Sequence, residues 1–273
     1  MQLSDEQLQR YARDGYLLVP NCFSPREVQR MLAELPELFA EDSERRVLEK
    51  QSGAVRSVYG SHATNEVFMR LARHPRLAEP AMQILGGEVY LYQFKINAKL
   101  AFVGDVWEWH QDFIFWQRED GVREPKLVTI SVFLDEVTEF NGPLMLVPAS
   151  HEVGVVEPTR IGAVPEGYET SPDWIANLTA DIKYSIDKEA LARLVSRRAI
   201  TAPKGPAGSV LFFDCNIAHA SVPNLSPTDR RIVLVTYNRV DNAPPPRQSP
   251  RPEFLVSRDL TPVTPLADDA LLT

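Results

Sequence analysis

The spacing of the apolar residues changes near residue 88, and this change constrains the fold more than any other feature of the sequence. Up to Gly87 the chain is predicted to be mainly helical. Ser4 and Ser24 each precede an apolar stripe, and Gln7 and Glu27 follow three residues later, which is the pattern of a capping box. From residue 88 onward, short runs rich in β-branched and aromatic residues are separated by turns, which is typical of strands.

The predicted strands cover residues 89–96, 128–134, 144–147, 209–214 and 232–238. They show no regular alternation with helices, apart from one helical stretch at 187–198, so the sequence predicts an antiparallel double-sheet barrel rather than a parallel α/β fold. We expect a single domain over residues 1–273. Its parts are a mostly helical region (1–87), a β core (88–242) and a proline-rich tail or lid (243–273), of which Pro244–Pro252 is expected to run extended over the surface.

The composition excludes several classes of protein. With 29 Lys and Arg against 37 Asp and Glu, the net charge is −8, which disfavours nucleic acid or an anionic membrane as a partner. No apolar run approaches the ~20 residues of a membrane span, and the polar amino terminus does not look like a signal peptide. The two cysteines form no C-x-x-C pair. We therefore expect a cytoplasmic protein, as a monomer or homodimer.

Five histidines narrow the search for a metal site. His110 and Asp112 are two residues apart, and on an extended segment such residues point to the same side, ~7 Å apart, so that both can reach one metal ion. A second histidine would complete two histidines and one carboxylate, the set that leaves open positions on non-haem Fe(II). Taken alone, this short spacing is weak evidence, because it also occurs by chance.

His219 strengthens the hypothesis. It follows an apolar strand, and Arg230 begins the next strand, whose antiparallel return can bring it back toward the His219 end. A guanidinium on a rigid element suits bidentate capture of a carboxylate, and Ser221 can add a hydroxyl. Iron ligands beside a carboxylate-binding arginine are what an enzyme that uses a 2-oxo acid needs.

At this point the sequence resembles the phytanoyl-CoA dioxygenase family of Fe(II)- and 2-oxoglutarate-dependent oxygenases, over roughly residues 1 to 242. Within the family it is similar to the bacterial branch that contains ectoine hydroxylase and hydroxylases of free, leucine-type amino acids. The resemblance rests on Tyr92–Asn97, Trp109–Phe113, Trp116, Phe140–Leu144 and His219–Ser221 with Arg230. It implies a double-stranded β-helix, the jelly roll of cupin-like proteins.

The resemblance also implies roles for individual residues. It assigns the iron to His110, Asp112 and His219, and 2-oxoglutarate to Arg230, Ser221 and Asn97. It assigns Gln93, Lys95 and Trp116 to the substrate. Lys95 stands where ectoine hydroxylase has an arginine, which moves the expected substrate from ectoine toward amino acids.

The implied reaction hydroxylates an aliphatic C–H of a small substrate with O2, while 2-oxoglutarate becomes succinate and CO2. Asp112 fills the position that chlorinating relatives leave open for halide, which favours hydroxylation. We expect a free L-amino acid or close derivative with a leucine-, isoleucine- or proline-like side chain. The alternatives are ectoine, a cyclic dipeptide or another secondary-metabolite intermediate, and, in another class, a non-catalytic metal-binding jelly roll that senses a ligand.

The segment Arg56–His62 offers further candidates. Arg56 can pair with a substrate carboxylate, and Tyr59 or His62 can contact its amino group. The alternative, a structural loop with a surface arginine, has equal weight from the sequence.

Overall fold

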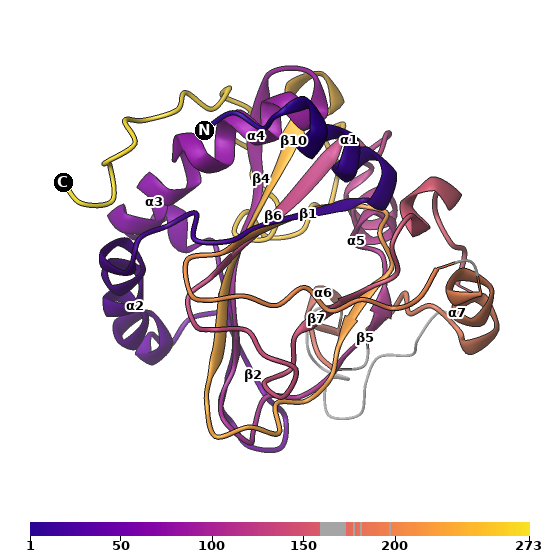
Figure 1. Cartoon of the computed structure of the whole chain (residues 1–273), viewed down its shortest axis with the longest axis horizontal. Helices are drawn as coiled ribbons and strands as arrows, with labels where there is room; N and C mark the ends of the chain where they lie inside the picture. The colour runs from indigo at the N-terminus through magenta and orange to yellow at the C-terminus, as the bar shows by residue number, and fades with distance from the viewer. Residues whose placement is uncertain (159–172, 177, 181, 197) are drawn as a thin grey trace.

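The computed structural model describes residues 1–158, 173–176, 178–180, 182–196 and 198–273. Its centre is a seven-stranded antiparallel sheet accompanied by a three-stranded one (Figure 1). The large sheet has the order β1 (Tyr16–Val19), β8 (Val210–Asp214), β6 (Leu127–Phe133), β10 (Arg230–Arg239), β4 (Val89–Lys99), β3 (Val55–Tyr59) and β2 (Arg46–Leu48). The small sheet has the order β5 (Trp107–His110), β9 (His219–Ser221) and β7 (Leu144–Leu146). These two sheets confirm the predicted jelly roll, mainly β with helical additions.

The amino-terminal helices begin where the capping pattern predicts. They are α1 (Asp5–Asp14), α2 (Pro25–Ala40), α3 (Glu66–Ala72) and α4 (Pro75–Leu85). At α1 the Ser4 hydroxyl accepts the Gln7 N–H, and the Gln7 side chain accepts the Ser4 N–H. Ser24 and Glu27 repeat this capping box at α2. The predictions of both helix starts are confirmed.

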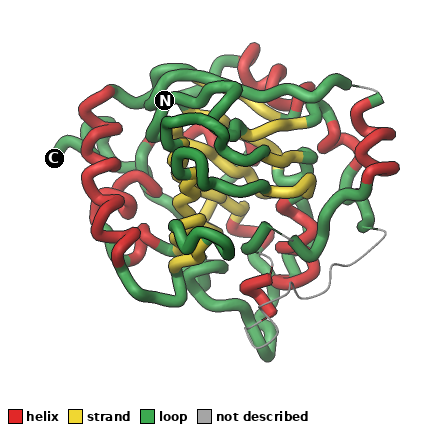
Figure 2. Tube along the Cα trace, turned by 90° about the horizontal axis from the view of Figure 1, so that it is seen from below, coloured by secondary structure: helices red, strands yellow, loops and turns green. Residues whose placement is uncertain are grey.

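The large sheet has two chemically different faces, because alternate residues of a strand point to opposite sides. On the outer face, Phe94 and Ile96 of β4 belong to the apolar core that also contains Leu35 of α2 and Phe68 of α3. In Figure 2 the strands occupy the centre, with helices around them. The inner face of β4 carries polar residues at every second position: Gln93, Lys95, Asn97 and Lys99.

The small sheet packs against the inner face of the large one. Leu146 of β7 shares an apolar cluster with Leu211 and Ile232 of the large sheet. Across the same gap the ring of Phe213 lies 5.3 Å from that of His219 in β9. The interior between the sheets therefore contains both an apolar part and the polar residues of β4.

Some elements differ from those expected. The mostly helical region also contributes β2 and β3, and β4 continues to Lys99, beyond the predicted end at Ile96. The remaining helices are α5 (Asp112–Phe115), a π-helix (Trp116–Asp120), α6 (Asp173–Ala176), α7 (Lys188–Val195) and 3-10 turns at Ser61–Ala63, Ser150–Val153 and Val240–Asn242. The expected helix at 187–198 corresponds to α7. No helix among the described residues is long and apolar enough to cross a membrane.

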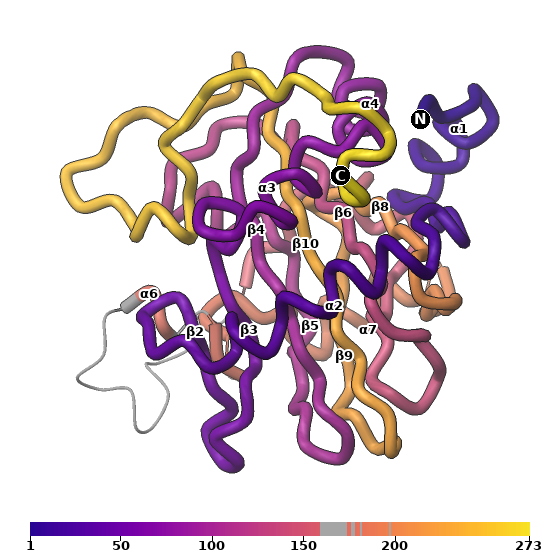
Figure 3. Tube along the Cα trace, turned by 90° about the vertical axis from the view of Figure 1, so that its left-hand side faces the viewer, coloured from indigo at the N-terminus to yellow at the C-terminus, as the bar shows by residue number. Residues whose placement is uncertain are grey.

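The carboxyl-terminal segment, residues 243–273, lies along the outside of the barrel. Figure 3 shows it in yellow, passing β4, α3 and α4. Backbone N–H groups of Ser257 and Val263 donate to carbonyls of β4, at Tyr92 and Val89, over 2.9 and 2.8 Å. Leu255 is completely buried. Val256, Ala270 and Leu271 are buried as well, so the segment is fixed to the barrel at several points although many of its other residues are exposed.

Candidate active site

Three side chains meet in the interior between the sheets: His110, Asp112 and His219. Nε2 of His110 lies 3.8 Å from Oδ1 of Asp112, and Nε2 of His219 lies 3.9 Å from the same oxygen. The two imidazole rings are 4.1 Å apart between centroids. Within the described part of the chain, this is the one group of three or more His, Cys, Asp or Glu residues whose ligand atoms all lie within 4.8 Å of one another.

The chain reaches this geometry through a corner between a strand and a helix. His110 is the last residue of β5 and stands opposite His219 of β9, whereas Asp112 is the first residue of α5. Gln111, between them, has the expected extended backbone (φ −116°, ψ 138°), although the strand ends at His110 and Asp112 already belongs to α5. The Phe113 N–H donates to the Cys215 carbonyl over 3.0 Å, which holds the first turn of α5 against the chain before β9.

Backbone carbonyls orient both imidazoles. Nδ1 of His110 donates to the Glu108 carbonyl over 2.6 Å, and Nδ1 of His219 donates to the Ile217 carbonyl over 3.0 Å. A carbonyl only accepts hydrogen bonds, so each proton sits on Nδ1 and the Nε2 lone pairs face Asp112. This arrangement leaves both Nε2 atoms available to a metal ion.

The charges of the three groups suit a divalent metal. Burial, followed by the neighbouring His219, lowers the pKa of His110 to about 3. Burial also lowers the pKa of His219. For Asp112, burial raises the pKa, but Lys95 and the two histidines outweigh it and the pKa is lowered. Two neutral imidazoles and one carboxylate form the facial set that binds non-haem Fe(II) and leaves positions open.

A seat for an anion lies on the inner face of the sheet. Arg230 is 3% exposed, and its Nε has no hydrogen-bond partner among the described residues. Burial lowers the pKa of Arg230 to about 10, so the guanidinium is still charged at neutral pH. A buried charge without a partner is costly, and a bound carboxylate would satisfy it. The residues present therefore fit a 2-oxo acid.

Ser131 belongs to the same face and was missed by the sequence analysis. Ser131 stands opposite Leu234 of β10. Leu234 is two residues after Ile232, so both point to the inner face, and Ser131 does too. The buried Oγ of Ser131 has no hydrogen-bond partner in the described structure. Its signal in the sequence is weak: Ser131 is a polar residue within an apolar strand, β6. A polar residue within an apolar strand is a candidate site residue when it points to the face that contains the functional side chains.

Ser221 and Asn97 also lie inside the barrel. Ser221 is 1% exposed and stands opposite Trp107 in the small sheet. Asn97 points to the inner face of β4, and its side-chain oxygen accepts a hydrogen bond from the Ser57 hydroxyl over 3.0 Å. Both residues are therefore in the interior that contains the triad.

A pocket with about 410 Å³ of empty space adjoins the triad. His110 and Asp112 line it together with four residues expected to contact the substrate: Tyr59, Gln93, Lys95 and Trp116. The Gln93 amide donates to the Leu255 carbonyl over 2.8 Å. Lys95 forms no hydrogen bond or ion pair with the described residues, so its ammonium group is free for a ligand.

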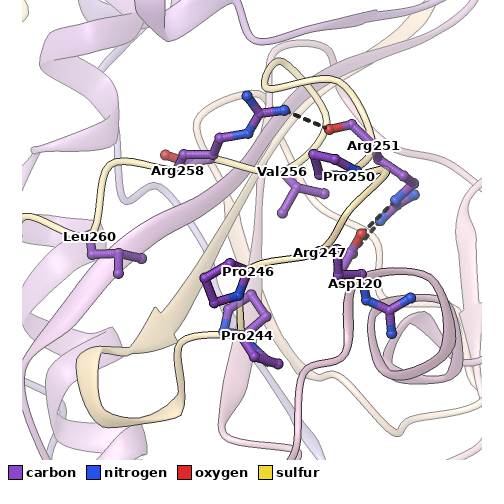
Figure 4. Close-up of a pocket in the computed structure, with 11 residues that line it drawn as sticks. Asp120, Pro244, Pro246, Arg247, Pro250, Arg251, Val256, Arg258 and Leu260 are labelled. Carbon is purple, nitrogen blue, oxygen red and sulfur yellow. Dashed lines mark hydrogen bonds and ion pairs between the residues drawn. The ribbon is translucent and has the colours of Figure 1, made fainter.

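Arg251 also lines this pocket, and no motif in the sequence indicated it. It comes from the carboxyl-terminal segment, and its Nε and Nη2 donate to the two carboxylate oxygens of Asp120 over 2.8 and 2.6 Å (Figure 4). The Tyr92 hydroxyl donates to the same carboxylate over 2.5 Å. Arg251 borders a second, outer pocket as well, which proline residues line and Figure 4 shows. It therefore separates the outer pocket from the triad.

Arg56 has surroundings different from those expected of a substrate ligand. Its guanidinium is 1% exposed and donates to both carboxylate oxygens of Glu49, over 3.2 and 3.0 Å. Its other N–H groups donate to backbone carbonyls at Leu178, Thr179 and Val106. All three nitrogens of the guanidinium therefore have acceptors, and Arg56 does not line the pocket at the triad. The structural alternative fits this arrangement, although the buried ion pair replaces the expected surface arginine.

His62 lies away from the triad. Its ring packs against Phe94, 5.3 Å between centroids, and Phe94 points to the outer face of β4. His62 lines a different pocket, together with residues of the carboxyl-terminal segment. The structure therefore does not bring His62 together with the other predicted substrate contacts.

Comparison with known proteins identifies the family. The profile of the phytanoyl-CoA dioxygenase family matches residues 11–232. The chain belongs to this family. Among its relatives, L-proline trans-4-hydroxylase of Streptomyces griseoviridis is 44% identical over 262 residues, which cover 96% of each chain. Ectoine dioxygenase of Stutzerimonas stutzeri is 40% identical over 265 residues, 94% of this chain and 85% of that one.

Solved structures agree with the family assignment. EctD from S. alaskensis with 2-oxoglutarate and 5-hydroxyectoine superposes with a TM-score of 0.81 at 33% identity, over 97% of this chain and 87% of that one. The same enzyme with bound Fe gives a TM-score of 0.79 at 34% identity, with the same coverage of both chains. The sequence-based identification of the phytanoyl-CoA dioxygenase family is thus confirmed.

Proposed function

We propose that the protein hydroxylates an aliphatic C–H of a free L-amino acid, with L-proline as the first candidate. The class of enzyme expected from the sequence, a hydroxylase dependent on Fe(II) and 2-oxoglutarate, is confirmed by the family and by relatives of high coverage. The observation that carries the proposal is the set of two histidines and one carboxylate beside a pocket that Lys95 and Arg251 also line.

In this proposal His110, Asp112 and His219 hold the iron. When bound, Fe(II) would activate O2, which is the oxidant: one oxygen atom would enter the succinate formed as 2-oxoglutarate loses CO2, and the other would enter the C–H bond of the substrate. The carbonyls of Glu108 and Ile217 keep the imidazoles turned toward the metal. Asp112 fills the position that a halide would need, which supports hydroxylation.

Arg230 is assigned to the distal carboxylate of 2-oxoglutarate, with Ser221 and Asn97 beside it. The unpartnered Nε of Arg230 supports this seat, because it can donate a hydrogen bond to a carboxylate. Ser131 stands opposite Leu234, four residues along β10 from Arg230, so its unpartnered Oγ belongs to a different part of the same inner face. The seat lies deep in the barrel, so it also keeps water away from the bound acid.

The substrate is assigned to the pocket bordered by Tyr59, Gln93, Lys95, Trp116 and Arg251. Lys95 and Arg251 suit a substrate carboxylate, while Trp116 and Tyr59 give the apolar walls that a proline-like side chain needs. The identity to L-proline trans-4-hydroxylase favours proline. The similarity to ectoine dioxygenases makes ectoine the second candidate. Lys95 argues against ectoine, because it stands where ectoine hydroxylase is expected to have an arginine.

We further propose that residues 1–273 form one oxygenase domain that acts in the cytoplasm, as a monomer or homodimer. Its small-molecule partner is supported by the relatives. The net charge of −8 supports the absence of nucleic-acid and membrane partners.

The decisive experiment measures succinate release with Fe(II), 2-oxoglutarate and O2 across L-proline, L-leucine, L-isoleucine and ectoine, with mass spectrometry of the products. We expect strong stimulation by L-proline and a product heavier by one oxygen atom. If only ectoine stimulates succinate release, then ectoine and not L-proline is the substrate. Iron binding without succinate release would support the non-catalytic sensor instead. His219→Ala, which removes one metal ligand, is the negative control.

A further inference from the structure

Lys99 is a buried lysine that the proposed reaction does not use. It is the last residue of β4, it is 1% exposed, and it stands directly opposite Arg230 in the antiparallel pair of β4 and β10. Residues opposite each other in such a pair point to the same face of the sheet. Lys99 and Arg230 therefore place two basic groups side by side in the interior of the barrel.

The ammonium group is enclosed. Nζ donates to the Val222 carbonyl over 2.6 Å and to the Asp105 carbonyl. Two close approaches hold the side chain in place: a Cβ on Gly104 would lie 2.5 Å from the Lys99 Cα, and a Cβ on Gly142 would lie 2.8 Å from its Cδ. A long lysine side chain usually extends its charge to water, and here the surrounding backbone prevents this.

The charged groups around Lys99 compensate it only in part, because the carboxylates of Glu49 and Asp105 raise its pKa by less than burial and the two arginines lower it. Arg230 of β10 and Arg56 of β3 are both cations. The carboxylate of Glu49 already binds Arg56, and that of Asp105 accepts the Val106 N–H over 2.6 Å. The hydrogen-bond partners of Nζ are neutral carbonyls. Burial, and next to it the charge of Arg230, lower the pKa of Lys99 to about 6.

We propose that Lys99 takes up a proton from solvent when 2-oxoglutarate binds, and that this proton couples cosubstrate affinity to pH. The inference rests on the proposed seat at Arg230. A distal carboxylate bound there neutralises the guanidinium that opposes protonation of Lys99 and adds a negative charge nearby. The amine then becomes an ammonium ion, and the pair of cations faces the carboxylate.

The sign of the pH effect follows from linkage. Because binding raises the pKa of Lys99 above its free value of about 6, protonation and 2-oxoglutarate binding favour each other. Affinity for 2-oxoglutarate is therefore highest at low pH, falls as the pH rises above about 6, and levels off above the pKa of the complex.

The test is calorimetry of 2-oxoglutarate binding to the full-length, Fe(II)-loaded protein without oxygen, at pH 7.5, in buffers of small and large ionisation enthalpy. The difference between the binding heats in the two buffers, divided by the difference in their ionisation enthalpies, gives the number of protons taken up on binding. We expect the wild type to take up a substantial fraction of a proton, at most about one for each 2-oxoglutarate bound. Lys99→Met should abolish this uptake, and Lys204→Met, a change at an exposed lysine, should preserve it.

Three outcomes would contradict the proposal. Binding to the wild type without proton uptake overturns it, whatever the variants do, so it is testable even if Lys99→Met does not fold. Equal uptake in Lys99→Met assigns the proton to another group. If 2-oxoglutarate does not bind, or if Arg230→Gln binds it as well as the wild type does, then the seat at Arg230 is wrong and the proposed function fails before the role of Lys99.

Discussion

Arg230 shows how much a single buried charge can decide. A guanidinium that is 3% exposed and has an unpartnered Nε is tolerated only where a ligand completes its hydrogen bonds. Arginine suits this role because its planar group binds a carboxylate through two parallel hydrogen bonds and stays charged even when it is buried.

We therefore expect Arg230→Gln to weaken 2-oxoglutarate binding by about 100-fold or more, because hydrogen bonds to charged groups are lost. Anaerobic titration of the Fe(II)-loaded variant with 2-oxoglutarate measures this directly. Iron affinity should be unchanged, since Arg230 is not among the three metal ligands. A variant that keeps its affinity for 2-oxoglutarate would contradict the assignment.

Arg56 has the opposite role, although it is also a buried arginine. All three nitrogens of its guanidinium have protein acceptors, so its function is to hold β3, the Glu49 loop and the chain at Leu178 together. We expect Arg56→Met to lower the free energy of unfolding by about 3 to 5 kcal/mol, because it leaves a buried carboxylate uncompensated. Chemical denaturation measures this loss.

The KM for the amino acid should change much less than the stability. The double variant Arg56→Met/Glu49→Gln is the control, and it should recover part of the loss because it removes the uncompensated charge as well. A large rise in KM without loss of stability would restore Arg56 as a substrate contact.

At the scale of elements, the start of α2 links a helix cap to an ion pair. Glu27 accepts the Ser24 N–H over 2.7 Å and also binds Arg76 of α4 over 3.1 Å. Burial raises the pKa of Glu27, but the hydrogen bonds from Ser24 and Arg76 outweigh burial and lower it. The carboxylate therefore stabilises the folded protein only while it is ionised.

Glu27→Gln should reduce the free energy of unfolding by about 1 to 3 kcal/mol at pH 7. The contribution of Glu27 is present above the unfolded pKa of about 4.5 and is lost as the pH falls through the lower folded pKa. Unfolding curves of both proteins should thus converge below about pH 4.5. The exposed Glu37→Gln on the same helix is the control, and an equal loss of stability there would contradict the argument.

At the scale of the whole molecule, the pocket is assembled from distant parts of the chain. One apolar cluster joins Tyr59 of β3, Trp116 of the π-helix, Leu178 and Leu255 of the carboxyl-terminal segment. The carboxyl-terminal segment also contributes Arg251 to the pocket, and its Leu255 carbonyl accepts a hydrogen bond from the Gln93 amide. Packing of the end of the chain and substrate binding are therefore coupled.

Leu255→Ala should cost about 2 to 5 kcal/mol of stability and also raise the KM for the amino acid more than the KM for 2-oxoglutarate. Leu35→Ala in α2 is a matched control, because Leu35 is equally buried but belongs to the core on the outer face. It should lose similar stability without a change in KM. Equal kinetic effects of both substitutions would show that loss of stability alone explains them.

The sequence by itself determined the fold class, the helix starts at Ser4 and Ser24, and the candidate triad of His110, Asp112 and His219. The helix caps and the spacing of His110 and Asp112 are local features of the sequence, whereas His219 came from its place after an apolar strand and from the resemblance to the family. The resemblance to the family also singled out Gln93, Lys95 and Asn97, which alternate along β4 and share its inner face.

Only the tertiary structure decided which buried cations are free. Arg56 and Arg230 look alike in the sequence, but one is saturated by Glu49 and by backbone carbonyls, while the other retains an unpartnered Nε. It likewise placed Arg251 in the pocket and Lys99 beside Arg230. Several of these contacts join groups more than a hundred residues apart, such as Arg56 with Leu178 and Lys99 with Arg230, and no local pattern records them.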